Sequence, residues 1–125
     1  MLYTELYKYI DGKWVQELKE PARIGKGKAS VVFNNLKNSA TGDMSSAFGN
    51  KTVATGDAAI AIGKETTAAG AASLAMGSYC KANGSNSFAG GITSEAFDAS
   101  FVFGIGCKSV APYTFVVGSS SRALG

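Results

Sequence analysis

Residues 67–91 read TAAGAASLAMGSYCKANGSNSFAGG, and the spacing of glycine in this stretch decides the fold. Glycine returns every seven residues here, and the same register holds without a break from Gly42 to Gly91. Eight glycines in one register indicate an internal repeat. A coiled coil is excluded, because glycine in every second helical turn costs ~1 kcal/mol each and the apolar residues do not follow a and d positions. We therefore predict short strands that end in tight corners, with glycine or asparagine supplying positive φ there.

Alternate heptads differ, so the repeating unit is about 14 residues long. One series contains DAAIAIG (57–63) and AASLAMG (71–77), and the other contains NKTVATG (50–56) and KETTAAG (64–70). Two strands and two corners per unit describe one coil of a flattened solenoid, with coils stacked ~4.8 Å apart into two parallel sheets. The fold expected is therefore all-β, a parallel β-roll (solenoid) of 14-residue coils.

The repeat divides the chain into two parts. One extra residue in 35–42 and one missing residue in 92–97 cancel, so we expect residues 28–125 to form about seven coils. Such a rod would be on the order of 33 Å long. Residues 1–27 lack the repeat and form a separate N-terminal segment.

Side-chain size alternates within the first series of heptads. Positions 3 and 5 are small, whereas positions 4 and 6 are large and apolar. Since alternate strand residues point to opposite faces, small residues should fill a thin interior and the large ones should form an outward stripe. A soluble monomer rarely exposes so large a stripe, so we expect burial against copies of the same chain. The predicted interface residues are Phe48, Ile60, Ile62, Leu74, Met76, Phe88, Phe101, Phe103, Phe115 and Val117. In the alternative interpretation this stripe fills the roll, and Ser and Ala face water.

The second series predicts a sheet with one solvated face. Candidate adhesive residues lie in its C-terminal half, beside an apolar column of Phe97, Val110 and Leu124. The candidates are Tyr79, Lys81, Glu95, Lys108 and Arg122. The alternative is a salt-bridge ladder, in which Glu95 pairs with its neighbours and a further segment covers the apolar column.

The motifs AAIAIG, SLAMG and the quoted 67–91 stretch resemble the head repeats of YadA-like trimeric autotransporter adhesins. The resemblance spans about residues 28–125, with Asp98 and Ala111 standing where glycine is expected. It implies a left-handed roll assembled as a homotrimer, which mediates attachment to a host-surface or matrix receptor from the bacterial cell surface. Similar repeats occur in phage fibre proteins, so the alternative is a structural fibre on the virion surface.

Residues 1–27 contain a hairpin signal. Asp11-Gly12 separates two alternating β-rich runs, which would place Tyr9 opposite Trp14. This β-hairpin either caps the open sheet edge of the first coil or docks the fibre to a capsid or tail protein, with Tyr7, Tyr9 and Trp14 as candidate docking residues. The N-terminus lacks the order of a signal peptide, so we expect a cytosolic origin or an excised fragment.

Composition argues against catalysis and cofactors. The chain has no histidine, which excludes Ser-His, Cys-His and His-containing zinc sites. A net charge of +3 without a dense basic cluster argues against nucleic-acid binding, and no apolar run is long enough to insert into a membrane. We therefore expect no enzyme activity and no cofactor. We also expect no metal site, because Asp43, Asp57 and Asp98 stand singly at corners.

The two cysteines occupy equivalent repeat positions. Cys80 and Cys107 lie two coils apart, which separates their Cα atoms by ~9–10 Å, too far for a disulfide. We predict two free, buried thiols.

Threonine columns of the kind used in ice binding stop after two rungs, at Thr41/Thr55 and at Thr52/Thr66. Their short length argues against ice binding.

Overall fold

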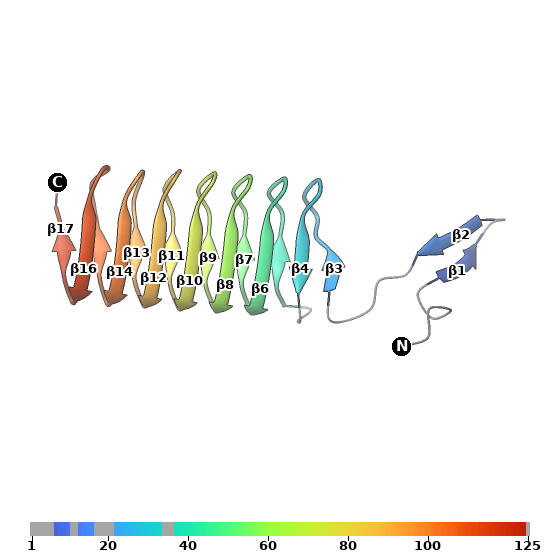
Figure 1. The fold of residues 1–125 in the computed structure, drawn as a ribbon, viewed down its shortest axis with the longest axis horizontal. Helices are drawn as coiled ribbons and strands as arrows, with labels where there is room; N and C mark the ends of the chain where they lie inside the picture. The colour runs from blue at the N-terminus through green and yellow to red at the C-terminus, as the bar shows by residue number, and fades with distance from the viewer. Residues whose placement is uncertain (1–6, 11–12, 17–21, 34–36, 125) are drawn as a thin grey trace.

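The computed structural model describes residues 7–10, 13–16, 22–33 and 37–124, and these residues form strands and turns (Figure 1). The strands are β1 (Tyr7–Ile10), β2 (Lys13–Gln16), β3 (Ala22–Ile24), β4 (Val31–Phe33), β5 (Ser39–Ala40), β6 (Ser46–Asn50), β7 (Val53–Ala54), β8 (Ile60–Lys64), β9 (Thr67–Ala68), β10 (Leu74–Ser78), β11 (Lys81–Ala82), β12 (Phe88–Ile92), β13 (Glu95–Ala96), β14 (Phe101–Ile105), β15 (Lys108–Ser109), β16 (Phe115–Ser119) and β17 (Arg122–Ala123).

Two sheets form the walls of a parallel β-solenoid. The eight-stranded sheet has the order β16-β14-β12-β10-β8-β6-β4-β3, and the seven-stranded sheet has the order β17-β15-β13-β11-β9-β7-β5. The chain alternates between the two sheets and makes about six turns from β4 to β16 (Figure 1). The parallel solenoid predicted from the glycine spacing is confirmed.

The register between coils follows the 14-residue unit. Ile60 pairs with Leu74 and Leu74 with Phe88, each 14 residues further on. Val31 pairs with Ser46 after 15 residues, and Phe88 pairs with Phe101 after 13. The long and short coils therefore occur where the sequence has its extra and its missing residue.

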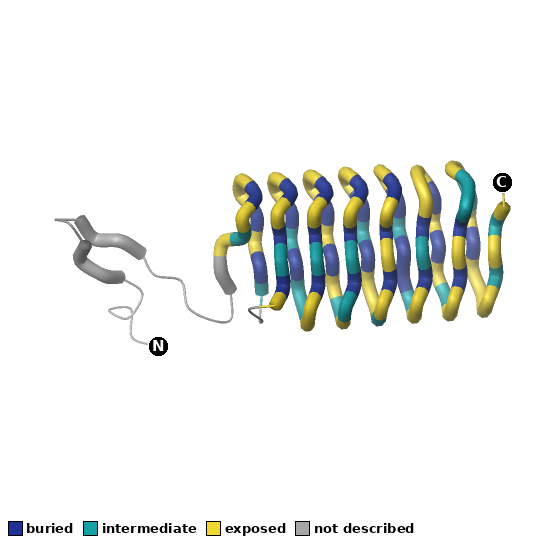
Figure 2. Tube along the Cα trace, turned by 180° about the vertical axis from the view of Figure 1, so that it is seen from behind, coloured by how far each residue is buried: buried dark blue, intermediate teal, exposed yellow. Residues whose placement is uncertain are grey.

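Small side chains fill the interior of the roll. Ala61, Ala75 and Ala89 of the long strands and Ala68 and Ala82 of the short strands are all 0% exposed. Figure 2 shows buried and exposed positions alternating along each coil. The prediction of a thin interior of small residues is confirmed, and the alternative in which the large residues fill the roll is wrong.

The corners differ from the expectation about glycine. The glycines one residue before the end of the long strands adopt positive φ, as at Gly63 in β8 (φ 123°). Those that end short strands, such as Gly70, do not, and they are needed because a Cβ there would collide with the carbonyl of Gly84 in the next coil. The left-handed residues of the corners are mostly not glycine, as at Ala72 (φ 53°) and Tyr79 (φ 59°).

An antiparallel strand begins the eight-stranded sheet. β3 pairs with β4, with Ile24 opposite Val31, a pairing that the repeat pattern does not predict. The N–H groups of Lys26 and Gly27 then donate to the carbonyl of Ala40 at 2.8 and 3.2 Å. Residues 22–27 therefore cover both sheets at the first coil.

The predicted N-terminal hairpin is described only in part. β1 and β2 pair antiparallel, with Tyr9 opposite Trp14. The proposed turn at Asp11-Gly12 lies outside the described residues, so the hairpin stays a prediction.

Candidate functional site: two outward faces

The predicted interface residues lie on the outward face of the eight-stranded sheet. We call the ten of them the apolar stripe: Phe48, Ile60, Ile62, Leu74, Met76, Phe88, Phe101, Phe103, Phe115 and Val117. Seven of the ten are exposed, from 37% at Ile60 to 73% at Phe115. Phe48, Leu74 and Phe88 are half-buried. Rings of neighbouring coils stack, with centroids 4.6 Å apart for Phe88 and Phe101 and 5.1 Å for Phe101 and Phe115. The stripe is therefore a continuous apolar surface along the rod.

The stripe is longer than predicted. Phe33 stacks on Phe48 at 4.7 Å, which extends the stripe into the first coil. Ile92 and Ile105 are register neighbours at the ends of β12 and β14 and are also exposed, at 48% and 56%. The sequence analysis named neither residue, although both are large apolar residues in equivalent positions of the repeat.

A glycine interrupts the stripe without leaving a hole. Gly90 stands where the other coils have a large side chain, opposite Phe103 in the register. A Cβ there would lie 2.8 Å from the ring of Phe103 and 3.0 Å from that of Phe88. The two rings therefore cover the position.

The outward face of the seven-stranded sheet carries the predicted adhesive residues. Lys81, Glu95, Lys108 and Arg122 are register neighbours in successive coils, and we call these four the charged ladder. Lys108 Nζ lies 3.3 Å from Glu95 Oε2. The structure thus brings the four together in one column.

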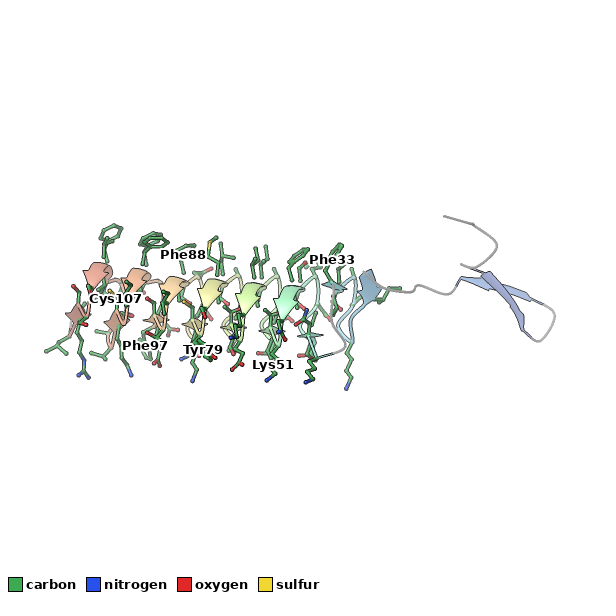
Figure 3. The ribbon with its side chains drawn as sticks, turned by 90° about the horizontal axis from the view of Figure 1, so that it is seen from below. Phe33, Lys51, Tyr79, Phe88, Phe97 and Cys107 are labelled. Carbon is green, nitrogen blue, oxygen red and sulfur yellow. The ribbon has the colours of Figure 1, made fainter. Side chains whose placement is uncertain are left out.

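Tyr79 lies beside the ladder rather than in it. It occupies the left-handed corner before Lys81, and the Nζ of Lys64 lies 5.7 Å from its ring centroid. Phe97 and Leu124 are 44% and 72% exposed and flank the ladder on its other side. Figure 3 shows Tyr79 and Phe97 on the opposite side of the rod from Phe33 and Phe88.

The corner aspartates accept backbone hydrogen bonds. Asp57 Oδ1 accepts from the N–H of Asp43 at 2.9 Å, and Asp98 Oδ1 accepts from the N–H of Ser85 at 2.9 Å. The part of the chain that the structure describes contains no group of three metal-binding side chains. These carboxylates therefore serve the corners that connect one coil to the next.

Cys80 and Cys107 are free and fully buried, as predicted. Cys107 lies inside the roll, and its thiol is 3.1 Å from the carbonyl oxygen of Gly118. Neither thiol reaches the surface, so both are part of the packing.

The candidate docking residues Tyr7, Tyr9 and Trp14 lie on β1 and β2. Their register is described but their side chains are not, so a docking role stays a prediction. In the described ranges no helix has the length and hydropathy to cross a membrane.

Comparison with known families identifies part of the solenoid. Two copies of the YadA head domain repeat match residues 40–66 and 54–79. Residues 40–79 are YadA-like head repeats. The match covers the coils from β5 to β10, and the later coils continue their register with one shortened turn. No curated protein and no solved structure matched the chain.

Proposed function

We propose that this chain is a non-enzymatic head segment of a homotrimeric fibre that attaches to a host surface. The apolar stripe carries the proposal, because ten large side chains face outward along one side of the rod. YadA-type heads are homotrimeric in general, and a YadA head repeat on a β-solenoid is a structural feature of adhesins rather than of enzymes.

The stripe suits an interface between copies better than an exposed surface. Apolar patches larger than a few hundred Å² are rare on soluble monomers and mark interaction sites. In a closed trimer with one such stripe per chain, each copy would bury the same residues. The seven-stranded sheet would then face outward and contact the receptor.

In the proposed trimer each chain is a left-handed roll, and the trimer is displayed at a cell surface. Members of the YadA-like family are usually surface-exposed. Three copies of one outward face on a stiff rod can engage a receptor at once. Multivalent contact of this kind raises weak single affinities into avidity without new contacts.

Solution mass measured by light scattering tests the trimer. The wild-type chain should have about three times the 12.8 kDa of one chain. Replacing Phe101 and Phe103 with Ser should reduce the mass to that of one chain, because it places polar groups in the middle of the stripe. The matched control replaces Phe97 and Leu124 with Ser on the opposite face and should leave the mass unchanged.

Binding of the trimer to matrix proteins or host cells tests the attachment role. A wild-type monomer would contradict the trimer, and a trimer that binds neither surface would contradict the adhesive role. The two parts of the proposal can therefore fail separately.

A further inference from the structure

Charged side chains are distributed unevenly over the rod. Lys26 and Lys28 lie at the edge that also holds Asp43, whose Oδ1 accepts from the backbone N–H of Lys28 at 2.8 Å. Asp57 and Asp98 occupy the same corner in later coils. Positive and negative groups are therefore mixed at this edge.

The charged ladder has three cations and one carboxylate. Glu95 uses both of its oxygens, since Oε2 pairs with Lys108 at 3.3 Å and Oε1 accepts from Asn83 Nδ2 at 3.0 Å. Lys81 and Arg122 are exposed, and in the described part of the chain neither has a carboxylate within 4 Å. The ladder thus has two cations available to an external anion.

The register places like charges next to each other. Lys108 and Arg122 are direct neighbours in parallel strands β15 and β17. Like charges opposite each other destabilise a sheet, so packing does not explain the arrangement. An anionic partner would remove this repulsion.

Apolar surface accompanies the charge along the same strands. Phe97 and Leu124 are exposed beside the ladder at 44% and 72%, and Tyr79 is 44% exposed near Lys81. Successive rungs are ~4.8 Å apart, so the cations and the apolar side chains form parallel rows. A partner that alternates anionic groups with flat, weakly polar rings would match both rows.

We propose that the charged ladder and the adjoining apolar column bind a linear anionic polysaccharide. Its sulfate or carboxylate groups pair with Lys81 and Arg122, while its sugar rings lie against Phe97 and Leu124. A polysaccharide fits better than a nucleic acid, because single-strand binding relies on stacking against several aromatic rings and this column has one. The inference rests on the proposed function, since the trimer leaves this face outward and repeats it three times.

Heparin immobilised on a sensor surface is the probe. We expect wild-type protein to bind it with an affinity that falls as salt rises, because exposed charges are screened. The Lys81→Gln and Arg122→Gln double variant should bind at least tenfold more weakly. The matched control, Lys26→Gln with Lys28→Gln, removes the same charge from the mixed edge and should bind within twofold of wild type.

One further double variant separates the charged row from the apolar row. Phe97→Ser with Leu124→Ser should weaken heparin binding at least threefold if sugar rings contact the column. An equal loss of heparin affinity in the double variant at positions 81 and 122 and in the control at positions 26 and 28 would overturn the inference. Binding would then follow net charge alone. Tighter binding to single-stranded DNA than to heparin would also overturn it.

Light scattering on the same samples separates this inference from the proposed function. A trimer that does not bind heparin overturns the polysaccharide site and leaves the trimer intact. A monomer that binds heparin overturns the trimer and leaves the ladder as the binding surface. Loss of trimer mass in the double variant at positions 81 and 122 would assign these residues to assembly and overturn the site.

Discussion

At the residue scale, the structure is governed by how closely adjacent coils approach each other. The coil-to-coil stack leaves no room for a Cβ at Gly42, Gly56 or Gly70, where the next glycine's carbonyl occupies the space. The left-handed corners impose no such limit, since side chains there point outward at Glu65 (φ 52°) and Thr93 (φ 54°). At the glycines that follow the short strands, the lack of room for a Cβ between adjacent coils therefore requires glycine, and backbone conformation does not.

Two glycine substitutions test this distinction. Gly70→Ala should lower the free energy of unfolding by about 3 kcal/mol or more, because the neighbouring backbone must move. Gly106→Ala should cost within about 1 kcal/mol, since its Cβ would meet nothing closer than 3.9 Å and Ser120 holds a similar φ in the next coil. Urea denaturation measures both. Equal costs for the two variants would contradict the role of close approach.

At the element scale, the unequal coils are accommodated by particular side chains. Asn38 lies within the long coil and donates from Nδ2 to the carbonyls of Phe33 and Gly49, at 2.6 and 2.7 Å. Its Oδ1 accepts from the N–H of Thr52 at 2.9 Å. At the short coil, the Oγ of Ser109 accepts from the N–H of Phe97 at 2.7 Å. Side chains thus replace backbone partners where the period changes.

The first coil depends on residues 22–27 for its edge hydrogen bonds. An open edge presents unpaired N–H and C=O groups to other chains, and pairing it removes that hazard. The N–H of Lys26 repeats the bond that Thr41 makes one coil later, at 2.8 and 2.9 Å. This segment is therefore a partial coil that closes the solenoid at this end.

Proline at this position tests the closure. Lys26→Pro removes the N–H that donates to Ala40, so amide hydrogen exchange in residues 25–33 should speed up at least tenfold. Lys26→Ala keeps the N–H and should exchange as wild type does. Slow exchange in the proline variant would show that the first coil does not rely on this bond.

At the scale of the whole molecule, the solenoid has an interior of small side chains and one apolar outer face. The interior is built from Ala, Ser, Thr and Cys, and its largest fully buried side chains are Val32 and Val102. The larger apolar residues that usually form a core lie instead on the apolar stripe. If the stripe is buried between chains as proposed, contacts between chains supply much of the hydrophobic stabilisation.

This arrangement predicts a concentration-dependent melting temperature. If three chains bury the stripe together, unfolding is coupled to dissociation and mass action applies. A tenfold increase in protein concentration should raise Tm by about 2–4 °C for a chain of this length. The variant with Ser at positions 101 and 103 should show no such dependence in scanning calorimetry. A wild-type Tm that is independent of concentration would contradict burial of the stripe between chains.

The candidate site could be predicted only in part from the sequence. Period-2 alternation placed Phe101 and Phe103 on one outward face, and the repeat placed Lys108 and Arg122 in one column. Equivalent positions in adjacent coils must be neighbours in any solenoid, which is why this reasoning works. The partners of Glu95 could not be predicted, because they depend on how far its side chain reaches. In the structure its carboxylate contacts Lys108 and Asn83.

The sequence by itself determined the period, the register with its long and short coils, and the inward or outward direction of each strand residue. These follow because a solenoid turns spacing along the chain directly into contacts in space. Only the tertiary structure decided the antiparallel start at β3, the cover that Phe88 and Phe103 place over Gly90, and the left-handed corners held by residues such as Tyr79. The first two depend on the local packing of one coil, which the repeat does not encode. The left-handed corners recur every 14 residues, but mostly at residue types that do not favour positive φ, so the sequence alone did not indicate them.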